Sequence, residues 1–376
     1  MRVAINARLL GSNTLRGWNR YSVNLIQKLP EFGVTPVLFT QNAIHLDHVE
    51  KWPKGKIEMH EAPRMSTMNF DQRWLPEQCR RYHVDLLHST FNFGLPCRWT
   101  KSCPQLLTLH DAIDHVYHRD RLSWWKKTSI SSIKTNWMFS SSRRSADRII
   151  TVSNHAKEDI SRRFCIPQAR IDVIHEAADD RFHRRWTEEE SNELQLRLSL
   201  KRPYFFYVGG WEKRKNIPFL LQAFSESRLE NVELVLAGGT EREKNELLAI
   251  GQSLGIIDSL KLLGWVDDKD LPGLYQNALA FVYPSEYEGF GLQICEAMAG
   301  NCPVFAADAT SLPEVLGEGG AVFSLSEPTE LGILLHRVAT NPSFRDALVA
   351  KASSRDADFS WEKTTELTVR VYKSVI

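Results

Sequence analysis

The segment LAFVYPSEYEGFGLQICEAMAGNCPVFA, residues 279–306, carries the pattern that decides the fold. A short apolar run ends at Tyr283, a polar loop with two glycines follows, and an apolar run of helical length begins near Leu292. Another short apolar run comes directly after it, at 303–306. Short apolar runs that alternate with helical segments are typical of a parallel sheet connected by crossover helices.

The same alternation continues along the whole chain. In the first half it predicts strands at 3–7, 36–40, 57–61, 86–89, 106–110, 148–152 and 171–174. In the second half it predicts strands at 204–208, 233–237, 260–263, 279–283, 303–306 and 321–323. Each set is long enough for its own α/β domain with a doubly wound, Rossmann-like sheet, and such sheets bind ligands outside the carboxyl ends of their strands. The sequence therefore predicts two such domains, whose strand ends can face each other across a central cleft.

The charge-rich segment 176–202 has no strand pattern and separates the two sets of strands. A hinge near 178–184 gives a first domain at 1–178 and a second domain at 184–358. We expect the remaining residues, 359–376, to form a helix that packs back toward the first domain. Within the separating segment, 187–200 predicts a helix, because Thr187 can cap it and three glutamates follow at the positive end of its dipole.

The length and composition agree with two globular domains and exclude several classes of protein. A chain of 376 residues corresponds to two or three domains of about 100 to 200 residues each. The net charge of +1 excludes a uniform field that would hold a nucleic acid. Six cysteines without a C-x-x-C spacing indicate free thiols in a reducing compartment. Because the chain has neither a signal-peptide pattern nor a run of about 18 apolar residues, we expect a cytoplasmic protein.

A loop that contains glycine follows the first predicted strand. Residues 11–17 read GSNTLRG and precede a predicted helix at 22–29. Such a loop either cradles an anion at the helix N-terminus or forms an ordinary turn. The spacing matches neither a dinucleotide fingerprint nor a P-loop.

Three adjacent cations follow the first predicted strand of the second half. The strand ends in YFFYVGG, and Lys213, Arg214 and Lys215 come a few residues later, before a helix at 218–224. Neighbouring cations repel one another, so this cluster is either an ordinary solvated run of charge or a binding site for a diphosphate.

Two glutamates in the quoted segment are candidates for ligand binding. Glu288 and Glu296 are eight residues apart, which corresponds to about 12 Å along a helix axis. Paired glycosidase carboxylates lie only ~5 to 9.5 Å apart, so two contacts on one long ligand fit better. Gly289 and Gly291 permit close approach of a ligand to the backbone. The neighbours of Glu296 are apolar, and a buried carboxylate needs a partner.

Several motifs, in order and spacing, resemble one enzyme family. In the second half these are YVGGWEKRKNI, VLAGG, LKLLGWVDDKDLPGLYQNA, FVYPSEYEGFGLQICEAMAGNCPV and SLPEVLGEGGAVF. Together they resemble the retaining nucleotide-sugar glycosyltransferases of the GT-B fold, family 4. In the first half, MRVAINARLL, RGWNRY, LLHSTFNFGLP, TLHDAID and RIITVSNHAKEDISRRFCIP resemble the N-terminal domain of that family, in particular of its mannosyltransferase-like members.

The resemblance implies a role for each matching residue. It assigns catalytic roles to Glu288, His110 and Lys215, and donor-binding roles to Arg214, Gly289, Phe290, Gly291, Leu292, Glu296 and Gly17. Lys215 would neutralise the donor diphosphate, and Glu296 would accept hydrogen bonds from the ribose hydroxyls. Glu288 and the backbone that follows it would hold the transferred sugar and its phosphate. His110 would contact the sugar near the reacting carbon, and the loop at Gly17 would approach the phosphates or the acceptor.

The chain departs from the family pattern at three positions. Many relatives have an arginine where this chain has Gly210, so either Arg214 supplies the missing charge or the leaving group is less fully neutralised. The family's usual glycine is Asn19 here, which weakens the assignment of the Gly17 loop. Gln293 stands where proline is common.

The expected reaction needs no metal and no cofactor beyond the nucleotide sugar. Charge grows on the leaving phosphate as an oxocarbenium-like state forms, and fixed cations stabilise that charge. Asp268 and Asp270 formally match a metal-binding D-x-D, but a helix cap explains them better, and Ser311 with Glu314 fits a capping box. The resemblance thus predicts transfer of a hexose, with mannose from GDP-mannose favoured, to a glycan or lipid-linked acceptor. The alternatives are a nucleotide-sugar epimerase, a phosphorylase, or a silent protein that binds nucleotide sugar or glycan.

The segment 119–150 is strongly basic within a neutral chain. It contains eight basic and two acidic residues, a net charge of +6, and three tryptophans. Leu122, Trp125, Ile133 and Trp137 can share one face of a helix. The segment is therefore either a basic amphipathic helix that meets an anionic membrane surface, which would make the protein peripheral, or a domain helix that packs on the sheet.

Overall fold

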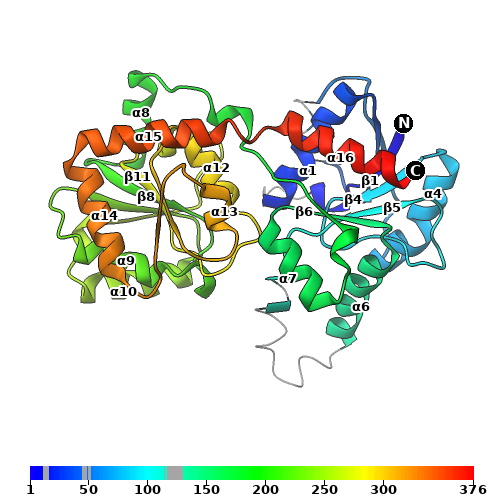
Figure 1. Cartoon of the computed structure of the whole chain (residues 1–376), viewed down its shortest axis with the longest axis horizontal. Coiled ribbons are helices and arrows are strands. Elements are labelled where there is room, and N and C mark those ends of the chain that lie inside the picture. The colour runs from blue at the N-terminus through cyan, green and yellow to red at the C-terminus, as the bar shows by residue number, and fades with distance from the viewer. Residues whose placement is uncertain (12–16, 45–48, 50–51, 114, 117–129) are drawn as a thin grey trace. The chain divides into compact units, whose positions relative to one another are not determined.

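The computed structural model describes all residues except 12–16, 45–48, 50–51, 114 and 117–129, and the side chains of 130–133 are likewise outside its description. The chain divides into two compact units (Figure 1). The first unit contains residues 1–176 and 360–376, and the second contains residues 177–359. Each unit is an α/β structure built on a parallel sheet.

The sheet of the first unit has the strand order β3-β2-β1-β4-β5-β6-β7 within the described residues, and every neighbouring pair is parallel. The strands are β1 (Arg2–Asn6), β2 (Thr35–Thr40), β3 (Glu58–Glu61), β4 (Leu86–Ser89), β5 (Gln105–Thr108), β6 (Arg148–Thr151) and β7 (Ile171–Val173). The helices include α1 (Gly17–Lys28), α3 (Thr67–Asn69), α4 (Leu75–Arg81), α6 (Ile130–Ser145), α7 (Asn154–Phe164) and α16 (Trp361–Val375). The strand order reverses between β1 and β4, which is the switch point of a doubly wound sheet.

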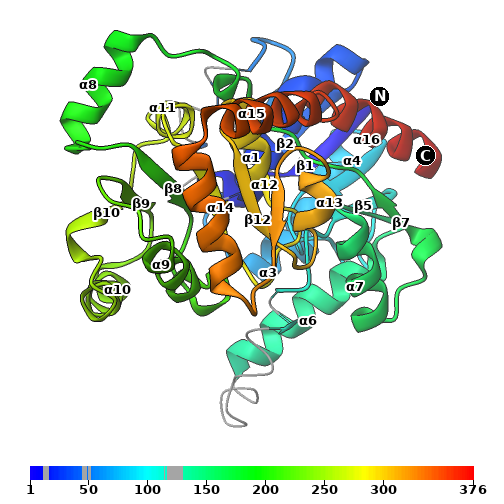
Figure 2. The ribbon, with the colours of Figure 1, turned by 60° about the vertical axis from the view of Figure 1, so that its left-hand side comes forward.

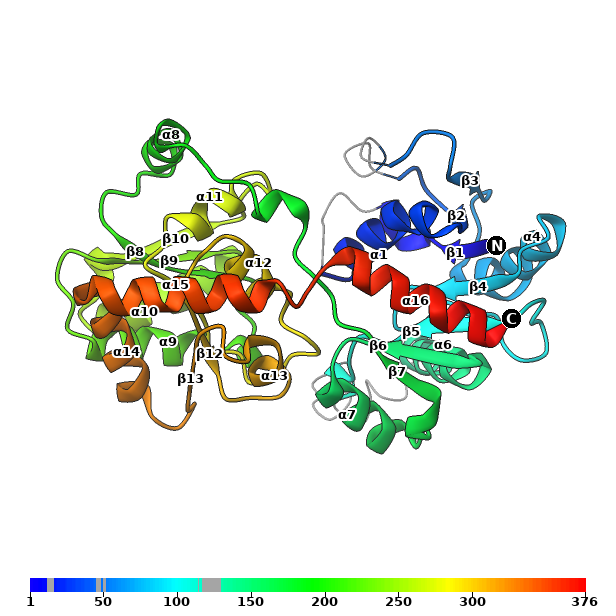
Figure 3. The same cartoon turned by 45° about the horizontal axis from the view of Figure 1, so that its top comes forward.

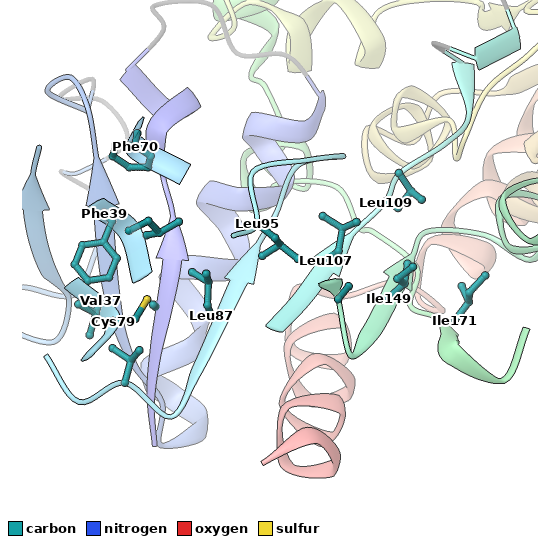
Figure 4. Packing of buried hydrophobic residues seen from close by; sticks show 14 of the residues in the cluster. Val37, Phe39, Phe70, Cys79, Leu87, Leu95, Leu107, Leu109, Ile149 and Ile171 are labelled. Atoms are coloured by element: carbon teal, nitrogen blue, oxygen red, sulfur yellow. The ribbon is translucent and has the colours of Figure 1, made fainter. Parts of the chain in front are cut away.

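One face of the first sheet holds a continuous apolar core (Figure 4). Leu87, Leu107 and Ile149 come from three neighbouring strands and are fully buried. They belong to one cluster with Cys79 of α4 and Ile160 of α7. Because side chains alternate along a strand, the residues next to these three point to the other face of the sheet.

The other face of the first sheet lies against α1 and α16, which contact each other (Figure 3). His88 of β4 is fully buried, with Nδ1 2.8 Å from the Tyr372 hydroxyl and Nε2 2.8 Å from the Thr108 hydroxyl. Burial lowers the pKa of His88 to about 3, so its ring is neutral. Thr364 donates a hydrogen bond of 2.7 Å to the carbonyl of His175. The last helix of the chain is therefore part of the first unit.

The sheet of the second unit has the order β10-β9-β8-β11-β12-β13, again with parallel pairing throughout. The strands are β8 (Tyr204–Val208), β9 (Glu233–Ala237), β10 (Leu260–Gly264), β11 (Ala280–Tyr283), β12 (Val304–Ala307) and β13 (Ala321–Phe323). Strands follow one another outward from β8 to β10 and from β11 to β13. The switch point therefore lies between β8 and β11, where a doubly wound sheet opens a crevice for ligands.

Helices cover both faces of the second sheet (Figure 2). They are α8 (Glu188–Leu198), α9 (Ile217–Glu226), α10 (Glu241–Ser253), α11 (Leu271–Gln276), α12 (Leu292–Ala299), α13 (Leu312–Leu316), α14 (Pro328–Thr340) and α15 (Pro342–Asp356). One group of contacts joins α9 to α10 and α14, and another joins α12 to α11, α13 and α15. Helix α12 is buried on nearly all sides, as its apolar sequence predicts.

The strands predicted from the sequence are all present, with ends displaced by at most two residues. The predicted helix 187–200 is also confirmed, because Thr187 caps α8 in a capping box with Glu190. The helix predicted at 22–29 begins earlier than expected, at Gly17. The burial of two side chains stabilises the first turns of this helix, since Asn19 and Tyr21 are at most 3% exposed. No helix in the described part of the chain is both long and apolar enough to cross a membrane.

Candidate active site

Three loops of the second unit meet at the switch point of its sheet. They follow the carboxyl ends of β8, β11 and β12. The backbone N–H of Glu286 donates to the carbonyl of Arg214 at 2.7 Å, which joins the first two loops. Ser311 Oγ lies 2.8 Å from the carbonyl oxygen of Phe290 and 3.1 Å from that of Glu288, which joins the second and third loops. Contacts between loops thus fix the backbone around Glu288.

The Glu288 carboxylate is the centre of a buried ionic cluster. Its Oε1 accepts hydrogen bonds from Lys215 Nζ at 2.6 Å, Arg214 Nη1 at 2.8 Å and Ser285 Oγ at 2.6 Å. The residue is only 8% exposed. Burial alone would raise the pKa of the Glu288 carboxyl, but the charges of Lys215 and Arg214 and the bonds they donate outweigh burial and lower it. Glu288 is therefore an anion held by two cations.

Lys215 is buried and held from two sides. It is 5% exposed, and Nζ also donates to the Tyr283 hydroxyl at 2.9 Å. The same nitrogen lies 5.0 Å from the centroid of the Tyr283 ring. The Tyr283 hydroxyl in turn donates to Gln293 Oε1 at 3.1 Å. Burial lowers the pKa of Lys215, and the neighbouring charge of Arg214 acts in the same direction, although Glu288 opposes both.

Arg214 supplies the second cation, and Glu212 positions it. Arg214 Nη2 donates to Glu212 Oε1 at 2.7 Å, while Nη1 donates to the carbonyl of Tyr287 at 3.1 Å. The Glu212 carboxylate fills the space beside Gly210, because a Cβ atom on Gly210 would lie 1.9 Å from Glu212 Oε2. The third cation of the predicted cluster, Lys213, is exposed to solvent. Two of the three cations thus converge on one carboxylate.

The segment from Gly289 to Leu292 leads into the N-terminus of α12. Gly291 has φ of 108°, and a Cβ atom there would lie 2.9 Å from the side chain of Leu312, so this position requires glycine. Phe290 and Leu292 are 4% and 8% exposed. The positive end of the α12 dipole therefore lies in the same loop as Glu288, where it favours negative charge.

Glu296 lies in the interior of the second unit. It is 1% exposed, and the Tyr275 hydroxyl of α11 donates to its Oε2 at 3.0 Å. The sequence expectation that this buried carboxylate needs a partner is confirmed. In this conformation Glu296 therefore presents almost no surface to a ligand.

Two local interpretations of the sequence are wrong. Asp270 precedes α11 but does not cap it, and instead it forms a two-bond ion pair with Arg197 at 2.7 and 2.8 Å. Ser311 precedes α13, but its side chain makes no capping hydrogen bond to that helix. Its hydroxyl instead donates to the carbonyl oxygen of Glu288. Among the described residues there is no group of three His, Cys, Asp or Glu side chains that could hold a metal ion.

Four residues of the site were not predicted from the sequence, namely Tyr283, Ser285, Thr310 and Ser311. Thr310 Oγ1 accepts from the backbone N–H of Glu288 at 3.1 Å. Only their positions could have indicated Tyr283, which is the last residue of a strand, and Ser285, which lies between that strand and Glu288. Nothing local marks Thr310 and Ser311, since their contact with Glu288 joins positions about 22 residues apart.

His110 follows β5 in the first unit, on the carboxyl side of that sheet. Its Nδ1 lies 3.1 Å from Glu176 Oε1, and its Nε2 lies 3.0 Å from the carbonyl oxygen of Thr90. Both partners are acceptors, so both ring nitrogens donate and the ring is an imidazolium. Burial opposes this charge, but the hydrogen bond and the negative charge of Glu176 outweigh it and raise the pKa of His110. The Tyr21 ring packs edge-on against it at 5.0 Å.

Gly17 is the first residue of α1 and is exposed. A Cβ atom on Gly17 would meet no atom of the described residues within 4 Å. Residues 12–16 of the predicted anion loop lie outside the described residues, so the role of this loop stays a prediction.

Comparison with known proteins identifies both halves of the chain. Residues 15–182 match the model of Glycosyltransferase Family 4, and residues 188–355 match that of Glycosyl transferases group 1. O-antigen chain mannosyltransferase B of Escherichia coli is 33% identical over 301 residues, which is 78% of this chain and 75% of that protein. MMP alpha-(1->4)-mannosyltransferase of Mycolicibacterium hassiacum is 29% identical over 319 residues, with coverage of 79% and 72%.

Solved structures show the same fold. The crystal structure of Anabaena HepE in complex with UDP and glucose superimposes with a TM-score of 0.76 and 15% identity over the full length of both chains. The fold, the two family matches and the mannosyltransferase relatives agree. The chain therefore belongs to the group 1 and family 4 glycosyltransferases, and it is a hexosyltransferase of the GT-B fold that is similar to mannosyltransferases.

Proposed function

We propose that the enzyme transfers mannose from GDP-mannose to a hydroxyl of a glycan or lipid-linked acceptor, with retention of configuration and without a metal ion. The relatives named as mannosyltransferases support the sugar. The observation that carries the proposal is the convergence of Lys215 and Arg214 on Glu288 at the switch point. This is where a doubly wound domain binds a nucleotide.

The two cations would stabilise the leaving diphosphate. When the bond between the sugar and the phosphate breaks, negative charge grows on the phosphate oxygens, and cations already in place lower the barrier. The Lys215 ammonium has three N–H groups and two acceptors among the described residues, Glu288 and Tyr283. One N–H therefore remains for a phosphate oxygen. Because two side-chain cations supply the charge, the proposed reaction requires no divalent ion.

Glu288 would hold the transferred sugar. Its carboxylate is ionised and its Oε1 is fixed by three donors, so the group is oriented before a ligand arrives. Sugar hydroxyls are donors that a carboxylate accepts well. The backbone of Gly289, Phe290, Gly291 and Leu292 would complete this subsite, and Glu296 would accept hydrogen bonds from the ribose hydroxyls.

His110 would contribute from the first unit. Its ring is an imidazolium, and its two N–H groups donate to the Glu176 carboxylate and to the carbonyl oxygen of Thr90. We assign it a contact with the transferred sugar, next to the carbon that reacts. The loop at Gly17 would approach the phosphates or the acceptor from the same unit.

A peripheral contact with an anionic membrane surface through 119–150 is part of the proposal. Trp137 of α6 is 43% exposed, which suits such a contact. Leu122, Trp125, Lys126 and Lys127 lie outside the described residues. The test is co-sedimentation with vesicles with and without acidic lipid, and with Lys126→Glu/Lys127→Glu. Lipid-independent pelleting, or no effect of the charge reversal, would rule out this part.

The transfer itself is tested by binding and by turnover. A thermal-shift panel of UDP, GDP, ADP and their sugars should show the largest shift with GDP or GDP-mannose, because a ligand of the native state raises its stability. Turnover of GDP-mannose in the presence of a chelator tests the metal independence. If donor turnover is the same in Glu288→Ala as in the unmodified enzyme, the catalytic assignment is wrong.

A further inference from the structure

A basic cavity of about 600 Å³ lies on the first unit, away from His110. It is lined by Arg98, Trp99, Lys101, Arg144, Asp147 and Arg170, among others. Asp147 directly precedes β6, and its Oδ2 accepts from the backbone N–H of Gln105 at the start of β5 at 2.7 Å. The cavity is thus at the amino ends of these strands. His110 follows the carboxyl end of β5, so the cavity is at the opposite edge of the sheet from His110.

The charges around the cavity do not balance. Lys101 is neutralised by Asp147, with Nζ 2.6 Å from Oδ1. Arg98 and Arg144 have no hydrogen-bond or ion-pair partner among the described residues. Arg170 donates to the carbonyl of Ala146, and it forms no salt bridge to a described carboxylate. Three positive charges therefore line one cavity without a counter-charge, and they repel one another unless an anion lies between them.

A second cavity of about 350 Å³ shares Arg144 and Arg170 with the first. It adds Arg143, whose guanidinium lies over the Phe164 ring at 3.9 Å, and Arg163, which is paired with Asp159 at 2.7 Å. Two of the three uncompensated arginines, Arg144 and Arg170, thus line both cavities. The positive region extends from Arg98 to the C-terminal end of α7.

Trp99 is a large aromatic side chain at the rim of the first cavity. It is 95% exposed, whereas most tryptophans of a folded protein are largely buried. An exposed tryptophan beside arginines is suited to a ligand that has an anionic part and an apolar or ring-shaped part. The stability of the fold does not explain why a tryptophan stands at position 99, because Trp99 buries almost no apolar surface.

We propose that Arg98, Arg144 and Arg170 form a second anion site, which binds a phosphoryl group while Trp99 covers the adjoining part of the ligand. Arginine suits a phosphoryl group because its planar fork can donate two parallel hydrogen bonds to it. The phosphoryl group belongs either to a soluble phosphate compound or to a lipid headgroup. The site is independent of the transfer reaction, since it shares no residue with the cluster around Glu288.

The test compares two probes on the full chain. Inorganic pyrophosphate serves as the soluble probe, and it is titrated into Lys215→Ala so that the other phosphate site is weakened. Vesicles of phosphatidylcholine, with and without phosphatidylglycerol, serve as the lipid probe. The test variant is Arg98→Gln/Arg144→Gln, because both side chains are exposed and carry no structural bond. The control is Arg202→Gln/Arg242→Gln, which removes the same charge from exposed positions of the second unit.

We expect the Arg98/Arg144 double variant to weaken binding of at least one probe by about tenfold or more, and the control to leave it unchanged. Loss of pyrophosphate binding identifies a soluble ligand, and loss of vesicle binding alone identifies a lipid headgroup. The proposal is overturned if neither probe binds, or if both bind equally well to the double variant and the control. It is also overturned if pyrophosphate does not bind and vesicle binding depends on Lys126 and Lys127 but not on Arg98 and Arg144.

Discussion

Lys215 Nζ lies 2.6 Å from Glu288 Oε1, and Arg214 Nη1 lies 2.8 Å from the same oxygen. The three residues carry a net charge of +1, and the Glu212 carboxylate, which pairs with Arg214 at 2.7 Å, brings the sum of the four charges to zero. A phosphate that contacts Lys215 and Arg214 gains from their charges at short range, whereas a neutral sugar gains only hydrogen bonds from Glu288. This relationship makes the charge of each residue testable by substitution.

Replacement of Lys215 by alanine should lower kcat/KM for the sugar donor by about 10²–10³-fold, since this is the usual cost of one donor that stabilises developing charge. Steady-state transfer kinetics measure the effect. Lys213→Ala is the matched control, because Lys213 has the same charge two residues away and is exposed. If both variants lose a similar factor in kcat/KM, then the reaction depends on the total positive charge of the loop and not on the position of Lys215.

The charge of Arg214 should be replaceable from position 210. Arg214→Gln should lower kcat/KM, because one of the two cations at Glu288 is lost. Adding Gly210→Arg should recover part of the activity by returning a cation to the same loop. The Glu212 carboxylate occupies the space next to Gly210, but it is the free end of a flexible side chain and can move. If the double variant is no better than Arg214→Gln, Arg214 does not compensate for Gly210.

The sequence predicted the elements of the fold better than the details of the site. Each strand is encoded locally, because a run such as YFFYV at 204–208 is short, apolar and followed by glycine. Glu288 and Lys215 were found because each belongs to a recognisable motif next to a strand end. The sequence predicts that Ser311 is a helix cap, which is wrong, because a serine before a helix has the same local pattern whether its hydroxyl bonds to that helix or to another loop. Which of these occurs depends on the packing of β11 beside β12, and no local pattern records it.

Removal of the Ser311 hydroxyl should loosen the Glu288 loop. Its one proton is shared between the carbonyl oxygens of Glu288 and Phe290, both of which Ser311→Ala leaves without this donor. We expect a loss of about 1 kcal/mol in the free energy of unfolding, together with a lower kcat. Chemical denaturation and transfer kinetics measure the two effects. In the control Ser253→Ala, a hydroxyl that donates to the carbonyl of Ile250 on the surface of α10 is lost, and kcat should not change.

The contribution of His110 to the free energy of unfolding should depend on pH, and it should decrease as pH rises. Glu176 raises the pKa of His110 above its ordinary value of 6.5. A raised pKa stabilises the folded state fully below the pKa of the unfolded chain, and this contribution disappears as pH rises through the pKa of the folded state. The melting temperature of His110→Gln should therefore fall further below that of the unmodified protein at about pH 6 than at about pH 9.

His88 provides the contrast for this measurement, because it is equally buried but neutral. Its pKa is lowered to about 3, so the folded protein keeps it neutral, whereas the unfolded chain protonates it as pH falls through its ordinary value of 6.5. His88→Gln should lower the melting temperature through the loss of its bonds to Tyr372 and Thr108, and by less at about pH 6 than at about pH 9, which is the opposite sign to His110→Gln. If His110→Gln behaves in the same way as His88→Gln, then His110 is not an imidazolium in the folded protein, and it would bring no positive charge to the transferred sugar.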